Sequence, residues 1–235
     1  MRLSIGEIAS SLRTECSRDH FAMVTNIATD SRCVRAGSLF SCIRGERVDG
    51  HDFIHQAVYN GAVAIIAEKP VEACGVPVLL VPDTIRALGQ LAQLWRTRTK
   101  ATVIGITGTA GKTTVKECVG GILARVGKIA KTPMNHNNQL GLACSILNTD
   151  GDETWWVMEV GISRPGDMAE LGSMLRPDLA LILNAGPGHA EGLSKLGVAR
   201  HKATLLEYLT PGGTALLSAD YAELSNACAQ YSVNK

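Results

Sequence analysis

A short glycine-rich segment between an apolar run and a helix-forming stretch constrains this chain more than any other feature. Residues 103–106 are a β-branched run typical of a buried strand in a parallel sheet. Residues 108–114 read Gly-Thr-Ala-Gly-Lys-Thr-Thr, and the stretch after them has helical character. This order of strand, loop and helix forms a phosphate cradle, because backbone N–H groups and the helix dipole face the anion. We therefore predict a nucleotide site made of Gly108, Thr109, Ala110, Gly111, Lys112, Thr113 and Thr114.

The glycine segment departs in one place from the standard phosphate-binding loop. That loop has another glycine five residues before Gly111, where this chain has Ile106, so we interpret the segment as a shortened variant. Lys112 is then expected to reach the terminal phosphates of the nucleotide, and the Thr113 hydroxyl to bind Mg²⁺. The alternative is a glycine turn in which Gly-Lys-Thr occurs by chance. Apolar residues recur at helical spacing after the loop and predict the buried face of its helix: Val115, Val119, Ile122, Leu123 and Val126.

The composition limits the class of partner and the compartment. The 235 residues carry a net charge of +1, which gives no electrostatic reason to expect nucleic acid or an anionic membrane as a partner. Seven cysteines are scattered without a Cys-x-x-Cys pair, as is typical of a reducing compartment. The N-terminus does not resemble a signal peptide, and no apolar run approaches the roughly 18 residues of a membrane span. We therefore expect a cytoplasmic protein.

Strand-like and helix-like segments alternate along the chain, which predicts an α/β fold. Residues 1–98 are expected to form a small N-terminal α/β domain. Residues 99–235 are expected to form a mostly parallel-sheet domain that carries the glycine loop. Ligands of such sheets bind outside the carboxyl ends of the strands, so polar residues that directly follow strands are the candidates for function.

Two places in residues 1–98 have functional potential. Ser31 and Arg32 place a short hydroxyl beside a guanidinium, a pairing that suits a phosphate or a ribose-bearing ligand. His51 lies between Gly50 and Asp52 on a polar loop and is a candidate contact for the same ligand. The alternatives are a solvated turn and a loop histidine with only a structural role, and the sequence favours these.

The candidate functional residues in residues 99–235 lie in three segments. An amide-rich segment contains Asn135, Asn137 and Asn138, which can bind a polar substrate or stabilise their own turn. Glu159 lies near the carboxyl end of a strand, a suitable place for a Mg²⁺ ligand. His189 lies in a glycine-containing loop after another strand and is a metal or phosphate ligand or a bystander.

These segments resemble, in sequence order, those of the Mur ligase family. The matching segments are residues 30–32, 45–53, 107–117, 135–141, 159–161 and 184–191, which together span nearly the whole chain. The resemblance implies ATP-dependent amide-bond formation in peptidoglycan precursor synthesis, in which the carboxylate of a UDP-MurNAc-peptide becomes an acyl phosphate and is attacked by an amine. It also implies a cytoplasmic enzyme that acts on small molecules, with a monomer as the expected assembly state.

The resemblance also implies roles for individual residues. Lys112 would act on the β- and γ-phosphates of ATP, and Thr113 and Glu159 would bind one Mg²⁺ and His189 a second. Lys202 lies where the family has a carbamylated lysine that helps to hold metal; on its own it would be interpreted as a surface lysine. The implied substrate contacts are Ser31, Arg32 and His51 in the N-terminal part and Asn135, Asn137 and Asn138 in the central part.

Two segments indicate a branch of the family. Residues 115–117, Val-Lys-Glu, and the Asn-x-Asn-Asn segment favour the branch that adds D-alanyl-D-alanine to UDP-MurNAc-tripeptide. The branch that adds the third peptide residue stays open, because it shares the Asp-Gly-His-Asp-Phe loop. Family members continue beyond the point where this chain ends and have a further domain that closes over ATP. We therefore expect this chain to be a fragment that is inactive as a ligase by itself, or else a non-catalytic module that binds nucleotide or UDP-sugar.

Overall fold

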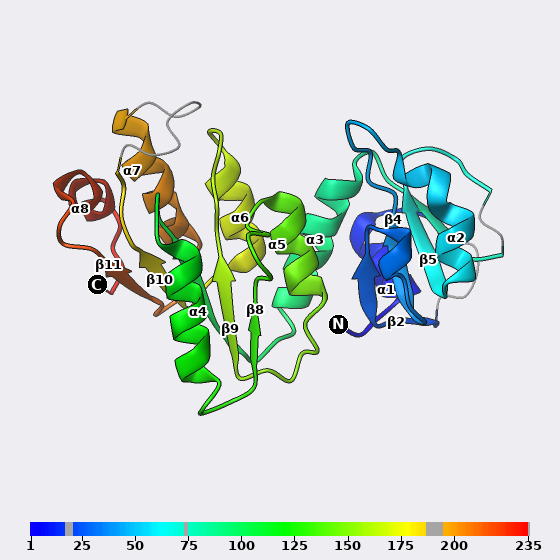
Figure 1. Cartoon of the computed structure of the whole chain (residues 1–235), viewed down its shortest axis with the longest axis horizontal. Helices are drawn as coiled ribbons and strands as arrows, with labels where there is room; N and C mark the ends of the chain where they lie inside the picture. The colour runs from blue at the N-terminus through cyan, green and yellow to red at the C-terminus, as the bar shows by residue number, and fades with distance from the viewer. Residues whose placement is uncertain (17–20, 73–74, 187–194, 235) are drawn as a thin grey trace. The chain divides into compact units, whose positions relative to one another are not determined.

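The computed structural model describes residues 1–16, 21–72, 75–186 and 195–234, and Figure 1 shows them as a ribbon. They form two compact units. The first contains residues 1–95 together with 146–150, and the second contains residues 96–145 and 151–235. The short return of residues 146–150 to the first unit has no signal in the sequence.

The first unit is built on a parallel sheet with the strand order β3-β4-β5-β6 in the described residues. The two strands that precede this sheet in the sequence, β1 and β2, form a small antiparallel pair. The core of this unit contains Phe40, Ile54 and Ile65, which come from β4, α2 and β5. Its elements are β1 (Leu3–Ser4), α1 (Ile5–Leu12), β2 (Met23–Val24), β3 (Asn26–Ala28), η1 (Ser31–Cys33), β4 (Ser38–Ser41), η2 (Gly50–Phe53), α2 (Ile54–Tyr59), β5 (Ala62–Ala67), β6 (Val78–Leu80) and α3 (Thr84–Arg96).

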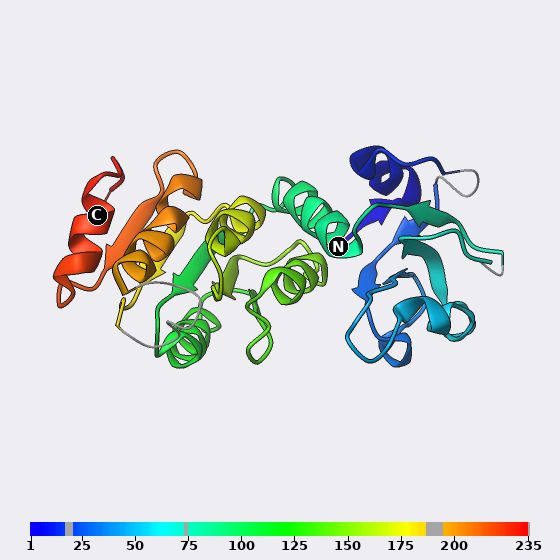
Figure 2. The ribbon, with the colours of Figure 1, turned by 90° about the horizontal axis from the view of Figure 1, so that it is seen from above.

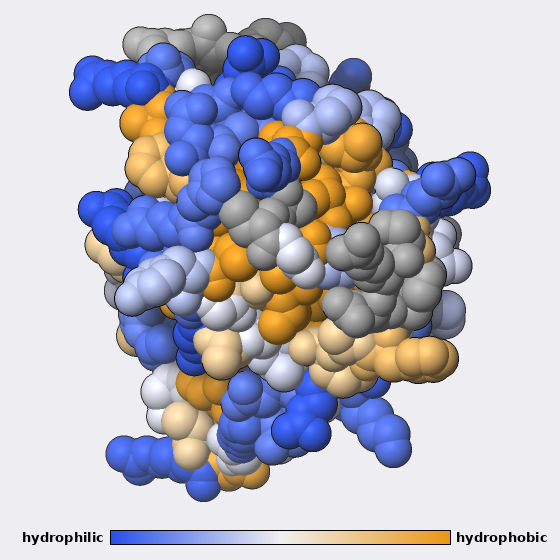
Figure 3. All heavy atoms as spheres, turned by 90° about the vertical axis from the view of Figure 1, so that its right-hand side faces the viewer, coloured by the Kyte–Doolittle hydropathy of each residue, from blue (hydrophilic) through white to orange (hydrophobic). Residues whose placement is uncertain are grey.

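Apolar side chains of the first unit are not all inside its core. Figure 3 shows apolar surface among hydrophilic side chains on one face of this unit. The largest exposed apolar side chains here include those of Phe21, Tyr59 and Val48. Scattered exposed apolar residues are normal in proteins and do not by themselves indicate a binding site.

The second unit is built on a parallel sheet with the order β11-β10-β7-β9-β8 in the described residues. Helices cover both faces of this sheet, with α4 on one face and α6 and α7 on the other (Figure 2). The elements are β7 (Thr102–Thr107), α4 (Lys112–Leu123), β8 (Ile129–Lys131), α5 (Gln139–Leu147), β9 (Trp155–Glu159), α6 (Asp167–Leu175), β10 (Leu179–Ile182), α7 (Lys195–Ala203), η3 (Thr204–Tyr208), β11 (Thr214–Leu217) and α8 (Ala222–Ala229). The predicted α/β fold with parallel sheets is confirmed.

The buried face of α4 differs from the one that the sequence predicts. Val115, Val119 and Leu123 pack against the sheet as expected. Ile122 and Val126, however, are 67% and 70% exposed, so their assignment to the core is wrong. The buried positions of this helix are Lys116 and Gly120. Lys116 is fully buried, and its ammonium donates to the carbonyls of Thr132 and Met134.

In the part of the chain that the structure describes, no helix is long and apolar enough to cross a lipid bilayer. The strand order of the second unit places β7 between β10 and β9. The carboxyl ends of these three parallel strands therefore lie side by side at one edge of the sheet. They lead into the glycine loop, the loop after Glu159 and the segment that begins at Asn184. This edge is the expected position of a binding crevice.

Candidate nucleotide-binding site

The glycine loop has the backbone geometry of a phosphate cradle. Gly111 has φ +80°, in the left-handed region that glycine tolerates, and α4 begins immediately after it. No side chain in the described residues caps this helix N-terminus. The first N–H groups of a helix have no acceptor within the helix, so they remain available to an anion.

Asn184, directly after β10, fixes the shape of the loop. Its Oδ1 accepts hydrogen bonds from the N–H groups of Thr109 and Ala110, at 2.7 and 3.0 Å. Its Nδ2 donates to the carbonyl of Ala110 at 3.0 Å. We expected no role for Asn184 from the sequence, although its position after a strand beside β7 is a signal that could have indicated one. Asn184 therefore supports the loop and leaves the helix N-terminus open.

Two lysines lie near the loop, and each has a perturbed pKa. Lys112 Nζ donates to the carbonyl of Gly108 at 2.9 Å; burial lowers the pKa of Lys112, and the negative charge of Glu159 opposes this. Lys202 on α7 is only 4% exposed. Its pKa is lowered to about 8, first by burial and then by the positive charge of Lys112. The expectation that a lone lysine at position 202 is a solvated surface residue is wrong.

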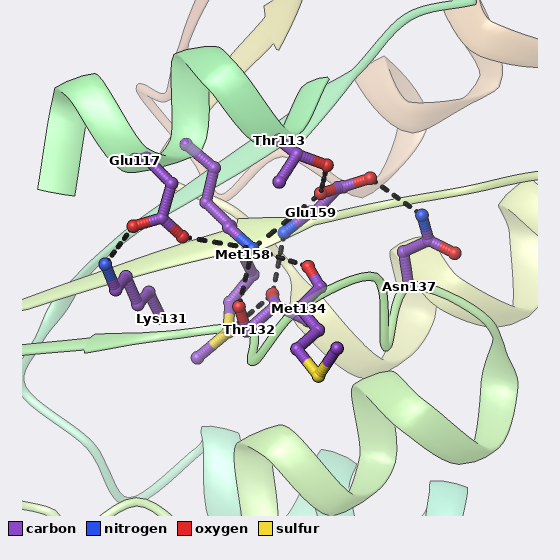
Figure 4. Close-up of polar contacts among 9 residues, drawn as sticks. Thr113, Glu117, Lys131, Thr132, Met134, Asn137, Met158 and Glu159 are labelled. Carbon is purple, nitrogen blue, oxygen red and sulfur yellow. Dashed lines mark hydrogen bonds and ion pairs between the residues drawn. The ribbon is translucent and has the colours of Figure 1, made fainter. Parts of the chain in front are cut away.

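Glu159 connects the loop helix to the amide-rich segment (Figure 4). Its side chain is 2% exposed at the end of β9. The Thr113 hydroxyl donates to Oε2 at 2.8 Å, and Nδ2 of Asn137 donates to Oε1 at 2.7 Å. A hydroxyl beside a carboxylate at a phosphate cradle is the set of oxygen donors that suits Mg²⁺, so the residues present fit this ion.

Asn135 and Asn138 make hydrogen bonds to backbone groups of their own segment. Asn138 caps α5, because its Oδ1 accepts from the N–H of Gly141 at 2.8 Å. The carbonyl of Asn135 accepts from the N–H of Asn137 at 2.8 Å. Asn135 and Asn138 are both exposed. Their contact with substrate stays a prediction. The structure shows that both make hydrogen bonds within their own segment.

The loop that follows Glu159 is tied to the amide-rich segment. The N–H of Gly161 donates to the carbonyl of Asn137 at 2.9 Å, and a Cβ at Gly161 would lie 2.6 Å from the Asn137 side chain. Farther along, buried Asp167 accepts from the N–H groups of Ser163 and Arg164 at 2.8 and 2.9 Å. Burial alone would raise the pKa of Asp167, but these donors lower it to about 2.

Ser31 is buried in the first unit, where its hydroxyl donates to Oε1 of Gln56 at 2.7 Å. The Arg32 side chain is 80% exposed and pairs with Asp30 in two parallel hydrogen bonds. This pair holds the pKa of Asp30 down to about 2 and raises that of Arg32. The Arg32 guanidinium remains accessible to a ligand, whereas the Ser31 hydroxyl already has a partner.

Both ring nitrogens of His51 have partners among the described residues. Its side chain is 4% exposed, its Nδ1 lies 2.5 Å from Oδ1 of Asp49, and its Nε2 accepts from the N–H of Glu68 at 3.1 Å. A nitrogen that accepts an N–H carries no proton, so this geometry fits the neutral tautomer protonated on Nδ1. The predicted substrate contact of His51 stays untested, and its geometry supports the structural alternative. His189 lies outside the described residues.

Two protein-family models match most of this chain. Residues 106–235 match the Mur ligase middle domain, and residues 23–96 match the catalytic-domain model of the Mur ligase family. This chain belongs to the Mur ligase family. The resemblance that the sequence motifs suggested is therefore confirmed.

Individual Mur ligases align with most of this chain. The UDP-N-acetylmuramoyl-tripeptide–D-alanyl-D-alanine ligase of Synechocystis is 37% identical over 211 residues, which are 88% of this chain and 46% of that protein. The structure of MurF from Acinetobacter baumannii matches 99% of this chain and 53% of its own, with 31% identity and a TM-score of 0.89. MurF from Thermotoga maritima, solved in complex with ADP, matches 90% of this chain and 49% of its own, with 35% identity and a TM-score of 0.82. This Mur ligase chain thus spans about half the length of the curated relatives that it matches.

Proposed function

We propose that this Mur ligase chain is the part of an ATP-dependent ligase that binds nucleotide and UDP-linked substrate. The ligase joins D-alanyl-D-alanine to UDP-MurNAc-tripeptide through an acyl phosphate. The observation that carries the proposal is the uncapped helix N-terminus of α4 beside Thr113 and Glu159, with two lysines next to it. The name of the Synechocystis relative supports the choice of substrates.

The reaction needs positive charge and fixed geometry at the glycine loop. A carboxylate becomes a good acyl donor only after phosphorylation, and two anions must meet when it attacks the γ-phosphate. Lys112, whose ammonium rests on the loop carbonyls of Gly108 and Thr109, moves to the phosphate oxygens when ATP binds. Thr113 and Glu159 would hold Mg²⁺, which neutralises phosphate charge when bound. His189 is proposed for a second ion.

Lys202 is proposed to carry a carbamate. A pKa of about 8 leaves an appreciable neutral fraction of this amine near neutral pH. The lone pair of the neutral amine forms an N–C bond to CO₂, a proton leaves to solvent, and a cation becomes an anion able to help hold metal. Burial beside Lys112 favours this change, because it replaces a repulsive pair of cations with an attractive pair of opposite charges.

In the first unit, Arg32 and Ser31 are proposed to contact the diphosphate part of the substrate. The exposed guanidinium of Arg32 offers bidentate donors of the kind that suit phosphate. In the second unit, Asn135, Asn137 and Asn138 are proposed to face the peptide substrate, and of these Asn137 is also fixed by Glu159. The assembly is proposed to be a cytoplasmic monomer.

The decisive experiment measures phosphate release and product mass with the protein encoded by the whole gene. We expect turnover with ATP, Mg²⁺, UDP-MurNAc-tripeptide and D-alanyl-D-alanine. In the matched arm, UDP-MurNAc-dipeptide and a diamino acid replace the last two substrates, and turnover only in that arm would assign the chain to the branch that adds the third residue. Binding of UDP-substrate and ADP without product in either arm would instead support a non-catalytic module.

A further inference from the structure

Lys116 is a fully buried lysine in the second turn of α4, and the proposed reaction gives it no role. Its ammonium donates to the carbonyls of Thr132 and Met134, each at 2.7 Å. These two carbonyls belong to the segment between β8 and α5, which leads directly into the amide-rich residues. Lys116 therefore ties the helix of the glycine loop to the start of a different loop.

The turn that Lys116 holds is conformationally unfavourable by itself. Met134 has φ +45°, a left-handed conformation that is rare for a residue with a long side chain. Its side chain is mostly exposed, so packing of that side chain does not impose the conformation. The hydrogen bond from Lys116 to its carbonyl does favour it. Asn137, which donates to Glu159, follows this turn by three residues.

Lys116 also reaches the surroundings of Glu159 in two other ways. Its Nζ lies 3.9 Å from Oε2 of Glu159 and 3.4 Å from Oε1 of Glu117. Thr132, whose carbonyl Lys116 binds, accepts the N–H of Glu159 on its Oγ1 at 2.8 Å. Figure 4 shows these contacts converging around Glu159 between Thr113 and Asn137. The ammonium thus lies beside the Glu159 carboxylate and binds the residue that accepts the Glu159 N–H.

We propose that Lys116 is a positioning residue for the site that binds nucleotide with Mg²⁺. It fixes the left-handed turn at Met134, and through that turn and its own charge it holds Glu159 and Asn137 in the geometry that the ion requires. The proposal rests on the proposed function only in taking this site to bind Mg²⁺ with nucleotide. Groups that orient metal ligands from outside typically change metal affinity by roughly 10- to 100-fold when removed.

The test replaces Lys116 with methionine, which has a similar length and no charge, in the protein encoded by the whole gene. The control is Lys131→Met, because Lys131 is exposed, pairs with the same Glu117 and does not reach the loop carbonyls. Calorimetry measures the affinity for ADP at several Mg²⁺ concentrations. Hydrogen exchange measures protection of the amides of His136 and Asn137. We expect Lys116→Met to weaken Mg²⁺-dependent ADP binding by roughly 10-fold or more and to accelerate exchange at both amides, and Lys131→Met to change neither.

A second pair of variants tests the turn without removing a buried charge. Met134→Pro cannot adopt a positive φ, whereas Met134→Gly can, and both change an exposed side chain. We expect the proline variant to lose more Mg²⁺-dependent ADP affinity than the glycine variant. A folded Lys116→Met protein with wild-type affinity and exchange, or equal affinities for the two Met134 variants, would overturn the proposal. Weakened ADP binding in Lys116→Met, with no ligation by the wild type, would support the positioning role and overturn the proposed function.

Discussion

The carboxyl edges of the two parallel sheets resemble each other in architecture and differ in how their polar groups are satisfied. In the first unit, the groups that follow β3, β4 and β5 mostly bind one another: His51 has Asp49 and Glu68, and Ser31 has Gln56. In the second unit, α4 begins without a side-chain cap, and the buried ammonium of Lys202 faces the positive charge of Lys112. Similar topology therefore yields one self-satisfied edge and one with spare binding capacity.

This difference indicates which edge can gain binding free energy from a ligand. A hydrogen bond already made inside the chain must be broken before a ligand can use the same atom, so a satisfied edge gains little from binding. Open N–H groups at a helix N-terminus, and lysines whose positive charges oppose each other, gain charge compensation when an anion arrives. Arg32 is the exception in the first unit, since its exposed guanidinium could serve a ligand at low cost.

The largest expected effect comes from removing a charge at the open edge. Lys112→Ala should lower the rate of ligation by roughly 100-fold or more, because no other loop side chain can place an ammonium on the phosphates. The free energy of unfolding should change little. Among the described residues, the half-buried ammonium of Lys112 bonds only to the loop carbonyls of Gly108 and Thr109. The matched control is Lys69→Ala at the other edge, and steady-state kinetics compares the two. Equal rates in these two variants would contradict the division between the edges.

An intermediate effect is expected at Asp167, which shows that the second unit also uses its polar groups for structure. Its pKa of about 2, against an ordinary 3.8, means that the ionised form is stabilised by folding. This contribution, roughly 2 kcal/mol, is present above pH 4 and lost as the pH falls through about 2. Asp167→Asn should remove that pH dependence, as measured by urea unfolding between pH 2 and 5. Asp152→Asn, at an exposed ion pair, is the control, and an identical pH profile in wild type and Asp167→Asn would refute the assignment.

The smallest expected effect tests whether the first edge is structural at His51. His51→Leu leaves Asp49 without its ring partner and the N–H of Glu68 without its acceptor, so unfolding of this unit should become easier by roughly 1–2 kcal/mol. Lys69→Ala removes only an exposed ion pair to Asp49 and should cost less than about 0.5 kcal/mol. Denaturant unfolding measures both, and calorimetry measures affinity for UDP-substrate. A loss of that affinity in His51→Leu with unchanged stability would show that the histidine contacts ligand after all.

Much of the fold could be predicted from the sequence because its signals are local. Ser4 and Glu7, three residues apart, form the capping box of α1, and the apolar run Ala62–Ala67 forms β5. The glycine loop likewise depends on neighbouring residues, since Gly111 supplies the positive φ just before the helix begins. Thr113 and Glu159 both follow from their positions near the carboxyl ends of parallel strands, and they meet because β7 and β9 are neighbours in the sheet.

The burial of long polar side chains could not be predicted from the sequence, because it depends on segments that are distant along the chain. Lys116 looks like a surface residue of an amphipathic helix, yet it is fully buried because carbonyls from the turn before α5 meet it there. The pKa of Lys202 is lowered first by burial and then by the positive charge of Lys112, which lies 90 residues earlier in the chain. By itself, the sequence determined the glycine turn that precedes α4, because adjacent residues set backbone geometry; we propose that a phosphate binds there. Only the tertiary structure decided which charges surround that cradle, because electrostatic interactions depend on distance in space rather than along the chain.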